Sequence, residues 1–306
     1  MTYSWESWGP INYHISSPLR GLKNEMFFLN PTGIPPGKSQ INISHSWINI
    51  WNYKKDYFKI DMEVLSSDVM ISTGLKNNQV IHVNLPFYYI SGGALDSTIE
   101  KFHSSIGITN ANREVSPHND IAYWIKDRQG NEFSVSRKYL RGLDMGHANI
   151  IYQKIHGLGS PLRKSFAVNI KAPVSPAEKL FESWRTDVTV SYTWTYRTGK
   201  NINHLTFGVT DFGSDTLDNI KLRDLNKSLF YAIEIPLGNN KRKIIQLLIN
   251  EKLTDDIPKF DRPTYIVNWG YKIKRRNTIF TFSIIENILQ FDNSPDIGFF
   301  AGRSFQ

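Results

Sequence analysis

Cysteine is absent from the 306-residue chain, which excludes disulfide bonds and thiolate metal sites. Apolar runs of about 18 residues or more are also missing, so the sequence offers no candidate for a transmembrane helix. Phosphate-binding glycine loops, zinc-ligand spacings and nucleophile elbows do not occur. We therefore expect no cofactor, no metal and no catalytic residue. A transmembrane barrel stays allowed, because each of its strands gives a weaker hydropathy signal than a helix.

A secretory leader is not visible at the N-terminus. Residues 1–10 (MTYSWESWGP) have neither a basic start nor an apolar core. If the protein is exported, we expect that its leader has been removed and that Met1 replaces it.

Positive charge is concentrated at two places in the chain. The formal net charge of +8 suits nucleic acid or an anionic surface as a partner. Lys and Arg gather in residues 241–243 and 274–276, each at the tip of an expected hairpin. Basic runs in turns are usually solvated, so we expect no nucleic-acid partner.

Aromatic residues are abundant, with 8 Trp, 14 Tyr and 18 Phe, and they favour strands. In residues 187–196 (DVTVSYTWTY), Val, Tyr and Trp alternate with Asp, Thr and Ser, and successive strand side chains point to opposite sides. Residues 203–210 repeat the alternation after a short turn that contains glycine, which indicates an antiparallel hairpin. Either water or lipid could contact the apolar face of such a hairpin.

The same alternation predicts about twelve strands along the chain. They comprise residues 39–51, 57–73, 80–90, 146–155, 164–172, 187–196, 203–210, 229–237, 243–252, 264–273, 278–289 and 297–305. From Lys76 onward, short and long connections alternate, so one end of an up-and-down meander would carry tight turns and the other end long loops. Outer-membrane barrels show this asymmetry between their periplasmic and extracellular rims.

We therefore predict an all-β fold: a single antiparallel up-and-down transmembrane β-barrel of about twelve strands, in residues 38–306. Residues 1–37 form an irregular N-terminal segment. Residues 92–143 form one long loop that contains a short helix, residues 94–106, and could act as a lid or plug. A change of phase near residues 66–68 predicts a β-bulge. The polar face that lines the lumen would then include Lys59, Asp61, Glu63, His82, Asn84, Lys171, Asp187, His204 and Lys272.

Residues 83–123 carry a resemblance to a known family. The pattern consists of a strand that ends in Leu-Pro-Phe, a Gly-Gly turn, Leu-Asp, Phe-His, and then Arg, Pro and Asn; the matching residues are Leu85, Pro86, Phe87, Gly92, Gly93, Leu95, Asp96, Phe102, His103, Arg113, Pro117 and Asn119. This pattern resembles bacterial barrel proteins of the domain-of-unknown-function family 3187. Gly142, Leu143 and Asp144 resemble the start of the next family strand, while Met145 and Gly146 depart from it. The resemblance implies an outer-membrane location and no established activity.

One polar cluster in the long loop could bind a ligand. Asp96, Glu100 and His103 would align along one face of a helix, and Arg113 follows them. A charge-paired loop without a ligand is the alternative interpretation. His45 and Ser46 do not form a dyad, because adjacent strand residues face opposite sides.

The sequence favours an outer-membrane barrel that acts as a porin-like narrow channel, or as a plugged pore, for small polar solutes. We expect a monomer in contact with membrane lipid and lipopolysaccharide. A lipid-modifying outer-membrane barrel enzyme with its site near the long loop is one alternative. A soluble lipocalin-like binder of an apolar ligand is the other.

Overall fold

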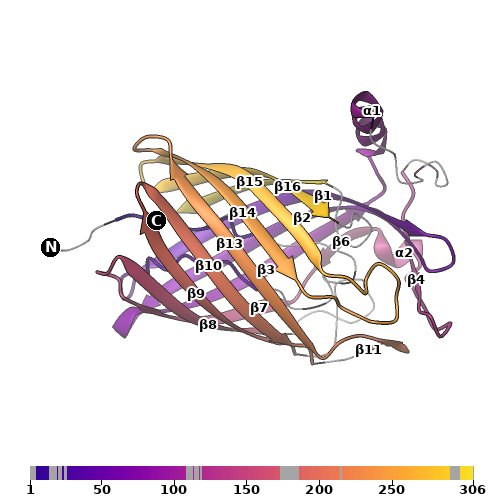
Figure 1. The fold of residues 1–306 in the computed structure, drawn as a ribbon, viewed down its shortest axis with the longest axis horizontal. Coiled ribbons are helices and arrows are strands. Elements are labelled where there is room, and N and C mark those ends of the chain that lie inside the picture. The colour runs from indigo at the N-terminus through magenta and orange to yellow at the C-terminus, as the bar shows by residue number, and fades with distance from the viewer. Residues whose placement is uncertain are drawn as a thin grey trace.

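The computed structural model describes residues 5–13, 19, 23, 26–107, 113, 117, 119–172, 186–213, 216–289 and 297–305. Twelve antiparallel strands form the wall of a barrel (Figure 1). In chain order these are β1 (Ser39–Lys54), β2 (Phe58–Leu75), β3 (Gln79–Ser91), β7 (Ala148–His156), β8 (Leu162–Ala172), β9 (Val188–Thr198), β10 (Asn201–Asp211), β13 (Leu225–Pro236), β14 (Lys241–Asn250), β15 (Thr264–Arg275), β16 (Thr278–Leu289) and β17 (Ile297–Phe305). The predicted all-β barrel and its strand number are confirmed.

Each wall strand pairs with its neighbours in the chain, as in an up-and-down meander. The sheet closes where β1 pairs with β17, from Ile41 opposite Phe305 to Asn49 opposite Ile297. Among the described strands, closure leaves no unpaired edge in the wall, which is a condition for a sheet to cross a bilayer.

The two ends of the barrel differ. At one end, here called the turn end, β2 and β3 are joined by a single 3-10 turn, Lys76–Asn78, and β9 and β10 by a two-residue turn. At the other end, the loop end, the connections are mostly long. Figure 1 shows both chain termini toward the turn end and the helices α1 and α2 at the loop end.

The wall is apolar on its outside and polar on its inside. On β9, Val190 is 43% exposed while Thr189 is 2% exposed. The same contrast holds on β10, where Phe207 is 45% exposed and His204 is buried. In a soluble protein the apolar side chains would be the buried ones. The arrangement therefore suits a barrel that is surrounded by lipid.

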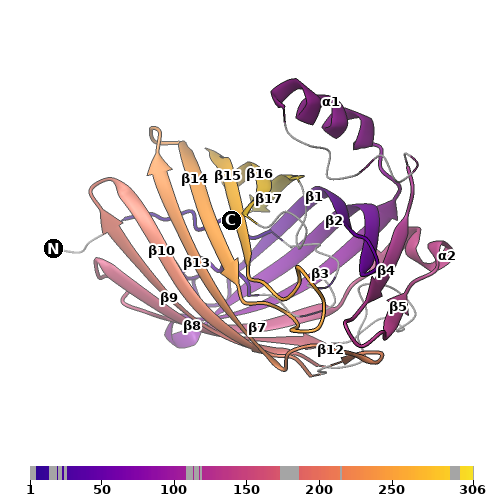
Figure 2. The same cartoon turned by 45° about the vertical axis from the view of Figure 1, so that its right-hand side comes forward.

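The hairpin of β1 and β2 reaches beyond the neighbouring strands at the loop end (Figures 1 and 2). Its inward face is apolar there, and residues such as Ile50, Phe58 and Met62 are buried in a cluster with loop residues Tyr123 and Phe260. Both ladders of β2 run through residues 66–68 without a register shift, so the predicted bulge is wrong. The phase of the sequence changes because the surroundings of β2 change along its length.

The long connection between β3 and β7 contains α1 (Asp96–Ile106), β4 (Ala122–Lys126), β5 (Glu132–Ser134), α2 (Arg137–Leu140) and β6 (Gly142–Met145). A small hairpin of β11 (Thr216–Leu217) and β12 (Ile220–Lys221) lies between β10 and β13. The expected helix in the long loop is present. Figure 2 shows α1 outside the barrel wall and away from the lumen. None of the described helices has the length and hydropathy needed to span a bilayer.

Candidate functional site: the filled lumen

Two described stretches of the N-terminal segment lie inside the barrel and occupy its lumen. One leg, residues 5–13, and a second leg, residues 26–38, run beside each other. The Phe28 N–H donates to Asn12 Oδ1 over 3.0 Å, and Asn30 Nδ2 donates to the Ser7 carbonyl over 3.2 Å. We call these two legs the plug.

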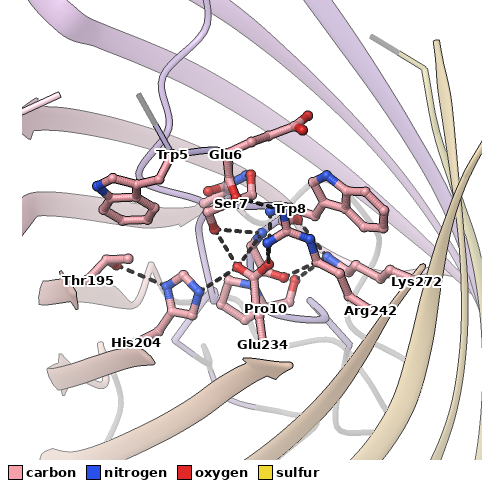
Figure 3. A network of polar contacts seen from close by, with 12 residues as sticks. Trp5, Glu6, Ser7, Trp8, Pro10, Thr195, His204, Glu234, Arg242 and Lys272 are labelled. Atoms are coloured by element: carbon pink, nitrogen blue, oxygen red, sulfur yellow. Dashed lines mark hydrogen bonds and ion pairs between the residues drawn. The ribbon is translucent and has the colours of Figure 1, made fainter. Parts of the chain in front are cut away.

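The carboxylate of Glu234 on β13 accepts three hydrogen bonds from the first leg (Figure 3). The N–H groups of Trp8 and Gly9 each donate to it over 3.0 Å, and the Ser7 hydroxyl donates to it as well. His204 Nε2 on β10 lies 2.8 Å from the same carboxylate. A buried carboxylate needs such a set of donors, since it has lost its hydration.

Two cations of the wall add to the attachment. Arg242 on β14 pairs with Glu234 over 2.8 Å and donates to the Glu6 carbonyl over 2.7 Å. Lys272 Nζ on β15 donates to three successive plug carbonyls, those of Trp8, Gly9 and Pro10, each over 2.8 Å. Charged side chains of the wall thus hold the first leg in place of strand pairing.

Apolar contacts hold the second leg. The ring of Phe28 stacks on that of Phe230 with 3.9 Å between centroids. Leu248, Ile266 and Ile285, which interrupt the polar inward face of the wall, belong to the same buried cluster. Gly208 on β10 allows close approach, because a Cβ at this position would lie 2.5 Å from the sulfur of Met26.

A cavity of about 140 Å³ remains between the plug and the wall. Asp68, His82 and Asn84 are among its polar lining residues. His82 Nδ1 lies 2.7 Å from the Ser72 hydroxyl, and Asn84 Nδ2 donates to Asp68 over 3.2 Å. The lumen therefore keeps a narrow space beside the plug, lined by both polar and apolar side chains.

Most of the expected lumen residues face inward. They are His82, Asn84, Lys171, Asp187, His204 and Lys272, all of which are buried. Lys171 and Asp187 form an ion pair of 2.6 Å. The structure spreads these residues around the wall: His204 and Lys272 lie at the attachment of the first leg, and His82 and Asn84 line the cavity beside the plug.

The expected lumen position is wrong for Lys59, Asp61 and Glu63. All three lie on the outward face of β2, on the same side as the exposed Leu65. Trp47 on the outer wall donates to Glu63 over 3.1 Å, and Lys59 pairs with Asp120 over 3.0 Å. The expectation depended on a bulge that β2 does not contain.

The loop cluster is partly assembled. Arg113 Nη1 lies 3.1 Å from Asp96 Oδ1, and Arg113 Nη2 donates to Asn49 Oδ1 over 2.6 Å. Both members of the ion pair are buried, and they attach the loop to the outer side of β1. Glu100 lies further along α1, and the side chain of His103 is outside the described part of the structure. Across the described residues, no group of three or more His, Asp or Glu side chains could hold a metal ion.

Sequence reasoning missed the plug and its partner Arg242. Arg242 belongs to a basic run that the sequence assigns to a solvated turn, yet it is 9% exposed. Two Trp residues in the first leg, Trp5 and Trp8, stack on Arg163 and Arg242, with 3.7 and 4.5 Å between the guanidinium and the ring centroid. Two tryptophans in an otherwise irregular segment are the sequence feature that could have indicated contacts of this segment with the barrel interior.

Comparisons with known proteins agree with this architecture. The family model described as protein of unknown function (DUF3187) matches residues 3–306. No curated protein matches the chain. Among solved structures, the COG4313 outer membrane channel from Pseudomonas putida F1 is similar, with a TM-score of 0.56, 10% identity, and coverage of 92% of this chain and 99% of that chain.

Two further solved structures are less similar. The toluene transporter TodX of Pseudomonas putida has a TM-score of 0.44 and 9% identity, and covers 99% of this chain and 98% of its own. A FadL homologue of Pseudomonas aeruginosa has a TM-score of 0.41 and 9% identity, with 94% of each chain covered. At such identities the likeness to the COG4313 channel supports the fold.

Proposed function

The chain belongs to the DUF3187 family, and we propose that it is an outer-membrane channel for small polar solutes whose lumen its own N-terminal segment closes. The apolar outer face and the polar inner face of the wall support the membrane location. By the usual orientation of outer-membrane barrels, the turn end faces the periplasm and the loop end faces outward. The barrel closes on itself, so a monomer is sufficient.

One observation carries this proposal: the element that fills the lumen is not part of the wall. Among the described residues, the plug contacts the wall mainly through side chains, and its backbone contacts with a strand are confined to residues 36–38 beside Gly74 at the turn end. The plug can therefore leave without breaking a wall ladder. A barrel whose lumen is filled by wall side chains could not open in this way.

The chemistry of the wall supports a polar solute. Once the plug has moved, the inward side chains of β8, β9 and β10 are mainly Ser, Thr, Asn and His, for example Asn169, Thr193 and His204. Such a lining replaces water hydrogen bonds around a polar solute. It does not suit a lipocalin-like binder, which needs an apolar interior.

A disulfide lock tests the proposal, and the chain has no cysteine to interfere. The N–H of Ile11 donates to the side chain of Gln246, whose Nε2 donates back to the Ile11 carbonyl over 3.0 Å. We expect Ile11→Cys with Gln246→Cys to form a cross-link between plug and wall. In planar bilayers, the oxidised protein should stay closed, and reduction should restore the openings seen in the unmodified channel.

The single variant Gln246→Cys, treated with the same oxidant and reductant, is the control. Equal currents in the oxidised and reduced double variant, with the cross-link verified by mass, would show that the plug is not the gate. An absence of current from every form would defeat the channel itself.

A further inference from the structure

An arginine lies on the lipid-facing side of the wall. Arg303 is an outward residue of β17, where it is paired with Ile43 on β1 and Phe280 on β16. Its guanidinium lies 4.3 Å from the ring centroid of Phe305 and 5.4 Å from that of Phe280. Phe305 is nearer the turn end, so the guanidinium group of Arg303 is directed toward that end of the barrel. Within the described residues, Arg303 has no carboxylate partner.

A hydrogen-bonding pair lies one outward row further from the turn end. His45 on β1 is directly opposite Ala301 on β17 and Ser67 on β2. His45 Nδ1 lies 2.8 Å from the Ser67 hydroxyl. When that hydroxyl donates to Nδ1, the proton of the neutral imidazole is on Nε2, which can then donate to an oxygen outside the wall.

Next to this pair, the outer wall is hollow. The hollow has a volume of about 540 Å³, and its lining is almost entirely apolar. Ala301 forms the floor of the hollow, since its small side chain lies between His45 and Phe282 in the ladder. Aromatic residues that include Trp47, Trp269 and Phe299 surround it.

These three features follow one another along the wall in the order cation, hydrogen-bond donor, apolar hollow. Successive outward rows are about 7 Å apart along a strand. From the membrane surface toward the bilayer centre, a glycerophospholipid has the same order: phosphate, ester carbonyl, acyl chain. We propose that this face of β1, β15, β16 and β17 binds a phospholipid of the leaflet at the turn end.

In this site Arg303 pairs with the phosphate, His45 donates to an ester carbonyl oxygen, and one acyl chain fills the hollow over Ala301. The lipid satisfies a charge and a donor that hydrocarbon would otherwise surround at a cost of several kcal/mol. Ser67 is a positioning residue, since it sets the tautomer of His45. Lys243, whose Nζ lies 4.9 Å from the ring centroid of Trp269, adds positive charge to the same side.

The site is a binding site and not a hydrolytic dyad. The ladders of β1 with β2 and with β17 are continuous through His45, so the backbone N–H groups beside it are engaged in the sheet. They cannot supply the donors that an ester oxyanion requires. The proposal rests on the membrane location given above but not on conduction.

Native mass spectrometry of the detergent-purified full chain tests the site, with dioleoyl phosphatidylglycerol as the probe. Arg303→Gln should weaken binding by about tenfold, since it removes a charge-assisted contact. Ala301→Trp should abolish binding because it fills the hollow. The diether analogue, which lacks the carbonyl, should bind about three- to tenfold more weakly than the diester to the unmodified protein. In His45→Leu the two lipids should bind equally.

Two variants on the far side of the barrel are the controls, Arg197→Gln at the turn end of β9 and Val190→Trp on its outer face. Both should bind the probe as the unmodified protein does. Binding that is unchanged by Arg303→Gln and Ala301→Trp, or that falls equally in the controls, would overturn the site. Conductance measured on the same samples separates this outcome from a failure of the channel proposal.

Discussion

Glu234 shows how one residue on the wall can determine where a distant segment lies. Its partners Trp8 and Gly9 are more than 220 residues away in the chain. Alternation along β13 places Glu234 on the inward face, and the structure agrees. No sequence pattern names its partners, because the contacts are made by backbone N–H groups, which every residue has apart from proline.

Replacing Glu234 should release the plug. In Glu234→Gln the buried guanidinium of Arg242 loses its counter-charge, and removing one partner of a buried pair costs about 3–5 kcal/mol. We expect a lower unfolding temperature in heat-modifiable gel mobility and a higher open probability in bilayers.

The matched control is Glu251→Gln at the loop end, whose pair with Arg223 is about one-third exposed. Exposed pairs contribute about 0–1 kcal/mol, so this variant should behave as the unmodified protein does. A Glu234→Gln channel with unchanged closure would mean that the carboxylate does not hold the plug.

At the scale of elements, strand alternation predicts the wall well where a strand has one environment throughout. On β9, β10 and β13, both faces are as predicted. On β2 the prediction fails, because the strand is lipid-facing near its turn end and covered by the long loop near Glu63. Because the long loop covers Glu63, an acidic residue can lie on this outward face. The local sequence pattern of β2 does not reveal that the loop covers it.

An arginine placed on the outer face of the wall should lower the stability of the barrel more in the middle of a strand than at its end. Phe207 is exposed in the middle of β10, whereas Thr198, at the end of β9, is exposed beside the tight turn. Phe207→Arg should lower the stability of the inserted barrel by about 2–4 kcal/mol, and Thr198→Arg by about 0–1 kcal/mol. Reversible denaturant unfolding in lipid vesicles measures both. Equal costs at the two positions would contradict a lipid-facing wall.

The helix α1 should be dispensable for closure. It lies outside the wall, and its first residue, Asp96, makes a buried ion pair with Arg113. Deletion of residues 98–107 keeps that pair, so conductance and closure should match those of the unmodified protein in bilayers. Larger currents after this deletion would identify the long loop, and not the N-terminal legs, as the plug.

At the scale of the molecule, composition and loop lengths were sufficient to predict a closed barrel with tight turns at one end. They were not sufficient to predict what fills it. Residues 1–37 contain several prolines and no alternation, which are the features of an exposed irregular segment. The interior position of the two legs, residues 5–13 and 26–38, follows from complementarity to the finished wall, including the apolar patch around Phe230 and Leu248, which forms only when the barrel has closed.

Deletion of residues 2–36 should therefore open the lumen without dissolving the barrel. The wall keeps all twelve paired strands, since the ladder of β1 begins at Ser39. We expect a conductance several times that of the unmodified protein, together with a lower unfolding temperature, because the patch that contacts Phe28 becomes wet. A synthetic peptide of residues 5–36 added from the turn side should restore closure, and a scrambled peptide should not. Restoration depends on side-chain complementarity, so addition from the loop side should act more slowly, as the apolar cluster around Phe58 and Phe260 covers that mouth.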